Sequence, residues 1–323
     1  MSTDGAGIVL LVSDNVWARH GDEIRSFAPG IEPVVYTGDE PADQAACERI
    51  NVVFFSQDLW PERSRGFWIS ILKSPRIAWL HTFSAGVDSP VFADLMEKGV
   101  RLTNSSGAAA SPIAQTAILY MLALSRDVRA WSRHQEAHEW ERVPFDELDG
   151  ANLAVIGMGP IGEEIARIAV ALRMNVEAVR RAPTGDEPCT THTFDRLDEV
   201  LSRADWVASA LPLTDDTRHV FDADRFARMK RGARFINVGR GELVDEDALV
   251  DALRSGHLAG AGLDVFEVEP LPGSSPLWDM DNVIITPHSS GATSRSGERA
   301  ERIFIDNLRR WVNGETLHNE VAR

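Results

Sequence analysis

The stretch LAVIGMGPIG, residues 153–162, decides the fold, and EEIARIAVAL follows it over residues 163–172. Its glycines have the spacing GxGxxG between an apolar strand pattern and an amphipathic helix pattern. Gly157 permits a tight turn, Gly159 lets a pyrophosphate approach the backbone, and Gly162 lets the helix pack on the strand. The first N–H groups of that helix then face the phosphates. In this context the motif predicts a dinucleotide-binding unit rather than a merely structural glycine turn.

The residues after the next strand pattern bear on the type of dinucleotide. A P-loop is excluded because Glu163 stands where that loop requires lysine. An NAD-preferring site places Asp or Glu at the end of the second strand, but here NVEAV, residues 175–179, runs into Arg180 and Arg181. A guanidinium matches the 2′-phosphate of NADP, whereas the competing Glu177 lies inside the strand pattern. The sequence favours NADPH; NADH, with a solvated arginine pair on a turn, is the alternative.

Short apolar runs alternate with helical patterns along the chain, which is the rhythm of βαβ units. The first group is IVLLVS at 8, EPVVY at 32, NVVFFS at 51, RIAWL at 76 and VRLTN at 100. After a helix expected from Ser111 to about Arg129, the second group is ANLAVIG at 151, NVEAV at 175, WVASALP at 206, RFINVG at 234, AGLDVF at 261 and NVIITPH at 282. Their continuous hydrophobicity predicts strands buried on both faces of a parallel sheet.

We therefore expect an α/β protein with two doubly wound parallel-sheet domains. A flavodoxin-like substrate domain is expected from residues 1–103 plus 290–323, and a Rossmann dinucleotide-binding domain from residues 104–289.

Composition narrows the classes of partner. The chain has 323 residues, and 33 Lys and Arg against 49 Asp and Glu give a net charge of −16. This acidic balance argues against binding to nucleic acid or to an anionic membrane surface. Cys47 and Cys189 form neither a disulfide framework nor a zinc spacing, and the apolar passage 108–124 is broken by polar residues. We expect a cytoplasmic protein with no membrane span.

Two other histidine features carry less weight. His134 and His138 have the i,i+4 spacing of a metal-binding pair, but Gln135 stands where the zincin pattern has Glu, so no metal site is expected. His81 is interpreted as a buried, hydrogen-bonded histidine.

Three polar residues directly follow buried-looking strand patterns. They are Arg240 in RFINVGRG, Glu269 in GLDVFEVEP and His288 in NVIITPHSSG. The carboxyl ends of parallel strands are where ligands bind in such sheets. Reduction of a carbonyl needs a proton donor, which an imidazole held by a carboxylate can supply, and a 2-oxo acid needs a cation that grips its carboxylate. Taken singly, each residue also fits a cap, a surface charge or a turn.

Together these motifs resemble the D-isomer-specific 2-hydroxyacid dehydrogenases over nearly the whole chain. The matching stretches are GMGPIG, ADWVASALPLTDDTRHVF, FINVGRGELVDEDAL, GLDVFEVEP and TPHSSGAT, in that order. The resemblance implies that Arg240 binds the substrate carboxylate and carbonyl, that Glu269 pairs with His288, and that His288 is the acid/base. The Arg180–Arg181 pair resembles the NADP-using glyoxylate/hydroxypyruvate reductase branch, and Glu269 argues against formate as the substrate, because the related formate dehydrogenases have Gln there.

The same resemblance implies the binding residues. In FSAGVD, the backbone N–H groups of Ser84, Ala85 and Gly86 would cradle the substrate carboxylate, beside Arg240 and His288. The cofactor contacts implied are Gly157, Met158, Gly159, Pro160, Ile161, Gly162, Arg180, Arg181, Leu211, Pro212, Thr217, Val238, Gly239, Asp264, Ser290 and Gly291. Of these, Asp264, Ser290 and Gly291 would lie along the nicotinamide. The stretch with Trp131 and Trp140 resembles a region near the subunit contact, which implies a homodimer.

The sequence thus predicts an NADPH-preferring reductase of small 2-oxo acids, such as glyoxylate or hydroxypyruvate, to D-2-hydroxy acids. The alternatives are an NAD(H)-dependent D-2-hydroxyacid dehydrogenase and a non-catalytic, dinucleotide-sensing protein similar to the corepressors that share this fold.

Overall fold

The computed structural model describes residues 7–322, which form two compact units. One unit comprises residues up to Ala109 together with those from Thr293 onward, and the other comprises Ala110–Ala292. The domain boundaries predicted after residue 103 and before residue 290 differ from these limits by six and three residues and stay a prediction. Each unit is built on a parallel sheet, so the expected α/β class with two doubly wound sheets is confirmed.

The sheet of the first unit has the strand order β2-β1-β3-β4-β5. Its strands are β1 (Val9–Ser13), β2 (Glu32–Tyr36), β3 (Val52–Phe55), β4 (Trp79–Thr82) and β5 (Arg101–Asn104), all paired in parallel. This is the flavodoxin-like order. In it the direction in which successive strands are added to the sheet reverses between β1 and β3.

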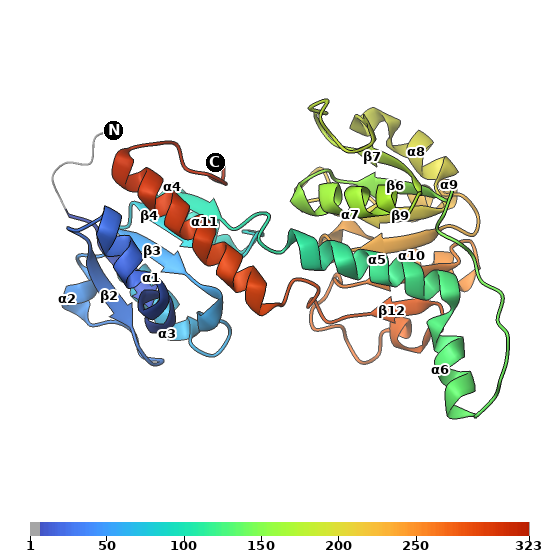
Figure 1. Cartoon of the computed structure of the whole chain (residues 1–323), viewed down its shortest axis with the longest axis horizontal. Coiled ribbons are helices and arrows are strands. Elements are labelled where there is room, and N and C mark those ends of the chain that lie inside the picture. Colours follow the sequence, from blue (N-terminus) through green and yellow to red (C-terminus); the bar gives the residue numbers. More distant parts are fainter. Residues whose placement is uncertain (1–6, 323) are drawn as a thin grey trace. The chain divides into compact units, whose positions relative to one another are not determined.

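Helices cover both faces of this sheet (Figure 1). The helices are α1 (Asp14–Phe27), α2 (Gln44–Cys47), α3 (Ser64–Leu72), α4 (Pro90–Glu97) and α11 (Ser294–Asn313), with a 3₁₀ turn at Gln57–Leu59. On one face Ile24 of α1 and Phe304 of α11 pack against the strands, and on the other Phe67 of α3 and Phe92 of α4 do so. Burial on both faces explains why the strands have no alternating polar pattern.

The sheet of the second unit has the order β12-β11-β10-β9-β6-β7-β8. Its parallel strands are β6 (Asn152–Ile156), β7 (Asn175–Val179), β8 (Thr190–His192), β9 (Trp206–Ser209), β10 (Arg234–Asn237), β11 (Gly260–Leu263) and β12 (Val283–Ile285). The direction of winding changes between β6 and β9, as in a dinucleotide-binding Rossmann fold.

Two layers of helices enclose the second sheet. On one face lie α5 (Ala110–Arg126) and α7 (Pro160–Ala171), and on the other α8 (Leu197–Arg203), α9 (Ala223–Arg228) and α10 (Glu246–Arg254). Short 3₁₀ turns lie at Phe194–Arg196, Gly241–Leu243 and Pro276–Asp279. The helices of each face bury their apolar side chains on the strands. This packing holds the strands rigidly, including the edge of the sheet at which they end.

The helix expected from Ser111 to about Arg129 is interrupted. Asp127 has φ of 47°, in the left-handed region, and its side chain accepts a hydrogen bond from Ala130 N at 3.1 Å. Asp127 therefore caps a separate helix, α6 (Val128–Glu136), which projects from the second unit in Figure 1. An aspartate that competes for backbone N–H groups explains the break.

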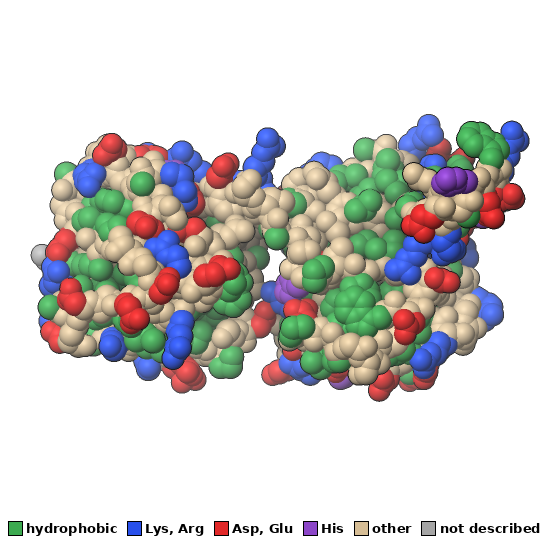
Figure 2. All heavy atoms as spheres, turned by 90° about the horizontal axis from the view of Figure 1, so that it is seen from below, with side chains coloured by type: hydrophobic (Ala, Val, Ile, Leu, Met, Phe, Trp, Pro, Cys, Tyr) green, Lys and Arg blue, Asp and Glu red, His purple; other side chains and the backbone are tan. Residues whose placement is uncertain are grey.

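The surface charges and the helices are relevant to binding of nucleic acids and membranes. On the face drawn in Figure 2, basic and acidic side chains are interspersed over each unit. None of the helices within residues 7–322 is both long and apolar enough to cross a membrane, while the cytoplasmic location stays a prediction.

His81 lies in the middle of the first unit, on β4, with no exposed surface. Its Nδ1 is 2.7 Å from Thr103 Oγ1, and its Nε2 is 3.0 Å from Ser105 Oγ. Burial lowers the pKa of His81 to about 3. The imidazole is therefore neutral in the folded protein at all pH values near neutrality.

This burial predicts acid sensitivity. In the unfolded chain the pKa of a histidine is about 6.5, so the unfolded state binds a proton that the folded state refuses, and stability falls as pH decreases from about 6.5 toward 3. Between about pH 7.5 and pH 5 the loss from His81 is about 2 kcal/mol. We expect His81→Gln, although less stable at pH 7.5, to lose less stability over this interval than the wild type, as measured by urea denaturation. His318→Gln, at an exposed position, is the control; parallel pH profiles for wild type and His81→Gln would contradict the assignment.

Candidate active site

Arg240, Glu269 and His288 follow three neighbouring strands of the second sheet, β10, β11 and β12. Because these strands are parallel, the three segments leave the sheet at the same edge. The turn that carries Arg240 is held by Asn237, whose Nδ2 donates to Arg240 O at 2.9 Å and whose Oδ1 accepts from Gly239 N at 3.1 Å. The guanidinium donates to Gly239 O at 2.8 Å.

Glu269 and His288 are in direct contact. His288 Nδ1 lies 2.8 Å from Glu269 Oε2, and Glu269 Oε1 accepts from Phe266 N at 3.0 Å. The carboxylate is thus fixed between a backbone amide and the imidazole. Since an ionised carboxylate only accepts, the Nδ1 atom carries the proton, and Nε2 is left for another partner.

The backbone of His288 is in the left-handed region, with φ of 49°. This region is uncommon for residues other than glycine, although asparagine, aspartate and histidine enter it more often than other residues do. The conformation is held by His288 N, which donates to Asp264 O at 2.8 Å. The turn after β12 therefore wraps around Asp264.

Asp264 is a buried carboxylate, only 1% exposed. It accepts hydrogen bonds from Thr286 Oγ1 at 2.5 Å, from Ser289 N at 2.9 Å and from Ser290 N at 3.2 Å, and also from the Ser290 hydroxyl. Thr286 is in turn hydrogen-bonded to the Tyr120 hydroxyl of α5. Because Thr286 has one proton and gives it to the carboxylate, Tyr120 must be the donor to Thr286.

Tyr120 and Thr286 are residues that sequence reasoning missed. Burial raises the pKa of Tyr120 to about 12, so its hydroxyl keeps its proton. The signal available was a single phenol within AILYMLAL, residues 117–124, an otherwise apolar stretch of α5. The carboxylate of Asp264 holds the His288 turn here, and the contact of Asp264 with a nicotinamide stays a prediction.

The glycine loop fits a dinucleotide pyrophosphate. Gly157 has φ of 101°, and a Cβ at Gly162 would lie 1.9 Å from Gly157 O, so neither position admits a side chain without a shift. A Cβ at Gly159 would meet no atom within 4 Å, which leaves space in front of the loop. The N-terminus of α7 has no side-chain cap, and because Pro160 has no N–H, the first N–H groups of this helix are those of Ile161 and Gly162, directly after Met158 and Gly159.

Other predicted cofactor residues lie at the same edge of the sheet. A Cβ at Gly157 would lie 2.7 Å from Ala210 O, and a Cβ at Gly239 would lie 2.8 Å from Leu211 O, so close packing joins these segments. Thr217 Oγ1 donates to Pro212 O at 2.8 Å and fixes the loop after β9. Val238 is buried directly after β10, and Ser290 and Gly291 continue the His288 turn.

The two arginines after β7 differ in their contacts. Arg180 Nη1 donates to Glu187 Oε1 at 3.0 Å, and the same carboxylate accepts from Thr184 N at 2.7 Å and from Gly185 N at 2.8 Å. The bonds from the backbone amides, first that of Thr184 and then that of Gly185, lower the pKa of Glu187 to about 2. Arg181 is exposed, and no hydrogen bond or ion pair joins it to a residue that the structure describes.

The competing ribose ligand, Glu177, is already engaged. Arg203 Nε donates to Glu177 Oε2 at 2.7 Å. Glu177 therefore forms an ion pair within the second unit. At the end of β7, Arg181 is the charged side chain that is left to contact a cofactor.

The predicted substrate loop follows β4 in the first unit. Its carbonyls are tied back: Ser105 N donates to Ser84 O at 3.0 Å, Asn104 Nδ2 to Ala85 O at 2.8 Å, and Ser84 Oγ to Gly86 O at 2.9 Å. Among the described residues, no acceptor lies within hydrogen-bond distance of the Ala85 and Gly86 N–H groups. Adjacent amides without an acceptor are the groups that a bound anion could occupy.

No metal centre is assembled from the residues described here. His134 Nδ1 lies 2.9 Å from Glu139 Oε2, and no group of three potential ligands among residues 7–322 could hold a metal ion.

Comparison with known proteins identifies the family. Residues 118–290 match the model of the D-isomer specific 2-hydroxyacid dehydrogenase, NAD binding domain. The chain is 37% identical over 257 residues to glyoxylate/hydroxypyruvate reductase B of Escherichia fergusonii, covering 77% of this chain and 79% of that one. It is 33% identical over 255 residues to D-3-phosphoglycerate dehydrogenase of Methanocaldococcus jannaschii, covering 78% of this chain but only 48% of that longer protein.

A solved structure extends the likeness to the whole chain. The D-isomer specific 2-hydroxyacid dehydrogenase from Xanthobacter autotrophicus Py2, in complex with NADPH and MES, is 30% identical with a TM-score of 0.80, covering 98% of each chain.

Proposed function

This chain belongs to the D-isomer specific 2-hydroxyacid dehydrogenase family of NAD(P)-dependent enzymes, and we propose that within it the protein is an NADPH-preferring reductase of small 2-oxo acids such as glyoxylate and hydroxypyruvate. The observation that carries the proposal is the 2.8 Å contact between His288 and Glu269 at the edge of the sheet where the strand of Arg240 and the glycine loop also end.

Each residue has a defined part in the reduction. When bound, the cofactor supplies the hydride that reaches the keto carbon. Arg240 binds the substrate carboxylate and polarises the carbonyl, because a guanidinium presents several donors in one plane. In the protonated imidazole, His288 Nε2 gives its proton to the carbonyl oxygen, while Nδ1 stays hydrogen-bonded to Glu269, which orients the ring. The Ala85 and Gly86 N–H groups contribute a cradle for the carboxylate. The Ser84 N–H, which was also predicted to take part, instead donates to Thr82 Oγ1 at 3.4 Å.

The proton donor is tested first. We expect His288→Gln to lower kcat for glyoxylate or hydroxypyruvate by at least about 100-fold, the usual contribution of a general acid, while NADPH still binds. Loss of absorbance at the NADPH band gives the rate, and fluorescence of the bound cofactor gives the affinity. His318→Gln, exposed and distant in the chain, should change neither. An unchanged kcat in His288→Gln would sink this mechanism.

Cofactor preference depends on the available arginine. We propose that Arg181 binds the 2′-phosphate and that Arg180, held by Glu187, mainly shapes the loop. Arg181→Ala should raise the KM for NADPH by about tenfold, since a charge-assisted hydrogen bond contributes about 1.5–3 kcal/mol, and should leave the KM for NADH nearly unchanged. Arg231→Ala, at another exposed arginine, is the matched control. A wild-type enzyme with lower KM and higher kcat for NADH would contradict the NADPH assignment.

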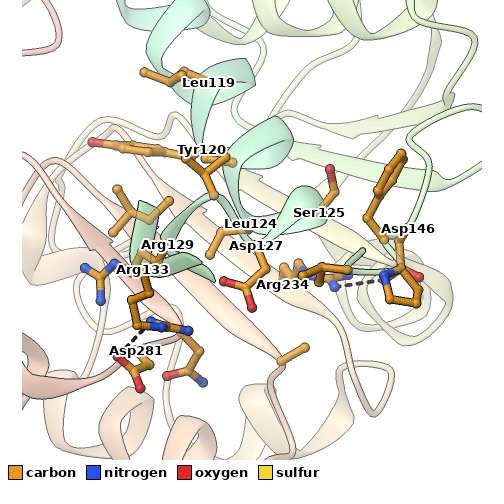
Figure 3. A pocket seen from close by; sticks show the side chains of 18 residues that line it. Leu119, Tyr120, Leu124, Ser125, Asp127, Arg129, Arg133, Asp146, Arg234 and Asp281 are labelled. Carbon is orange, nitrogen blue, oxygen red and sulfur yellow. Dashed lines mark hydrogen bonds and ion pairs between the residues drawn. The ribbon is translucent and has the colours of Figure 1, made fainter. Parts of the chain in front are cut away.

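We also propose that the protein is a homodimer. Exposed apolar side chains gather along the segment from α5 to the loop after α6: Leu119, Leu122, Val128, Trp131, Trp140 and Phe145. Trp140 is 96% exposed. A cavity of about 660 Å³ opens beside them, with Leu119, Tyr120 and Leu124 on α5 and Arg129 and Arg133 on α6 (Figure 3). Apolar surface of this extent is typical of an interface.

The dimer is tested by mass in solution. Light scattering after size exclusion should give about twice the chain mass of 35.6 kDa. Trp131→Glu should shift the protein toward the monomer, because a carboxylate would be buried without a partner. Trp278→Glu, at an exposed tryptophan outside this surface, should remain a dimer. A wild-type protein with the mass of one chain would refute the proposal.

A further inference from the structure

The first unit contains an apolar cavity that the proposed mechanism does not use. It has a volume of about 490 Å³ and lies between α3 and α4, where β3 and β4 end. Its lining includes Phe55, Trp60, Trp68, Phe83, Ser84 and Phe92. The volume is in the range typical of small-molecule sites.

Aromatic rings form the wall of this cavity. The centroid of Phe55 lies 5.0 Å from that of Trp68 in an edge arrangement and 5.4 Å from that of Phe83, and Trp68 lies 5.5 Å from Phe92. Each ring is thus held by its neighbours, so the cavity keeps its shape without a ligand. Such a wall suits a flat or branched apolar group.

The rim of the cavity is incompletely covered. Trp60 is 59% exposed, and so is Leu72, which also lines the cavity. Covering large apolar side chains with that exposure by an apolar group lowers the free energy of the system.

The cavity adjoins the anion cradle, because Ser84 lines the cavity and directly precedes Ala85 in the chain. The cradle is formed by Ala85 and Gly86, whose N–H groups have no acceptor among the described residues. In a 2-oxo acid, the carboxylate and the third carbon are both attached to the keto carbon. A carboxylate on the cradle therefore brings the substituent at the third carbon within reach of the cavity.

We propose that this cavity binds the side chain of the substrate, and that the substrates used most efficiently are 2-oxo acids with an aromatic or branched apolar side chain, with Trp60 as a specificity-determining residue. This inference rests on the proposed reductase function and shifts its preferred substrates from glyoxylate and hydroxypyruvate to 2-oxo acids with larger side chains. Glyoxylate has no side chain, and for the hydroxyl of hydroxypyruvate the lining offers few polar groups, the hydroxyls of Ser84 and Ser89 and the indole N–H groups of Trp60 and Trp68.

The test compares kcat/KM for glyoxylate, hydroxypyruvate, 4-methyl-2-oxopentanoate and phenylpyruvate, each with NADPH and with NADH. We expect the wild type to favour the last two acids. Trp60→Ser should lower kcat/KM for phenylpyruvate by about tenfold or more, as loss of pocket contacts does, and change that for glyoxylate by less than about twofold. Trp60→Phe should restore most of the loss, and Trp278→Ser should behave as the wild type.

The outcomes separate the two levels of the proposal. If glyoxylate is the preferred acid and Trp60→Ser affects all acids equally, the inference is overturned while the reductase function stands. If none of the acids is reduced although the cofactor binds, both are overturned. If Trp60→Ser changes the mass of the protein in solution instead of its selectivity, a second copy of the chain covers the cavity and the inference is wrong.

Discussion

The geometry of the second unit depends on one buried carboxylate. Asp264 is removed from solvent, and donors from Thr286, Ser289 and Ser290 surround it. A buried charge without such partners would cost several kcal/mol, so the segment that supplies the donors is confined to one conformation. That segment also carries His288. The hydrogen bonds that stabilise the Asp264 carboxylate therefore also position the imidazole of His288. Tyr120, through its hydrogen bond to Thr286, connects α5 to the same network.

The parallel sheet supplies the second constraint. Arg240, Glu269 and His288 come from three different strands, yet the pairing of β10, β11 and β12 brings their segments to a common edge. Turns then fix each side chain locally: Asn237 holds the turn of Arg240, and the Phe266 amide holds Glu269. Rigid strands with short, hydrogen-bonded turns are the arrangement that keeps reacting groups in place without reorganisation.

Much of this could be predicted from the sequence, because the signals are local. Continuous apolar runs predicted both sheets, and the GxGxxG spacing predicted the tight turn at Gly157. The contacts that could not be predicted join residues far apart: Tyr120 and Thr286 are separated by 166 positions. The engagement of Arg180 by Glu187 likewise depends on how the loop closes on itself, and the break at Asp127 on a competition between helix and cap. None of these leaves a periodic pattern in the sequence.

The left-handed backbone of His288 has a consequence for how this protein can change. A histidine there is held in a conformation that is costly for a side chain with a Cβ, by about 1–2 kcal/mol. Glycine would occupy the same turn with less strain, so the turn by itself does not require a histidine. At this position activity and stability therefore oppose each other. A relative that no longer needs the reaction could replace the histidine and become more stable but inactive.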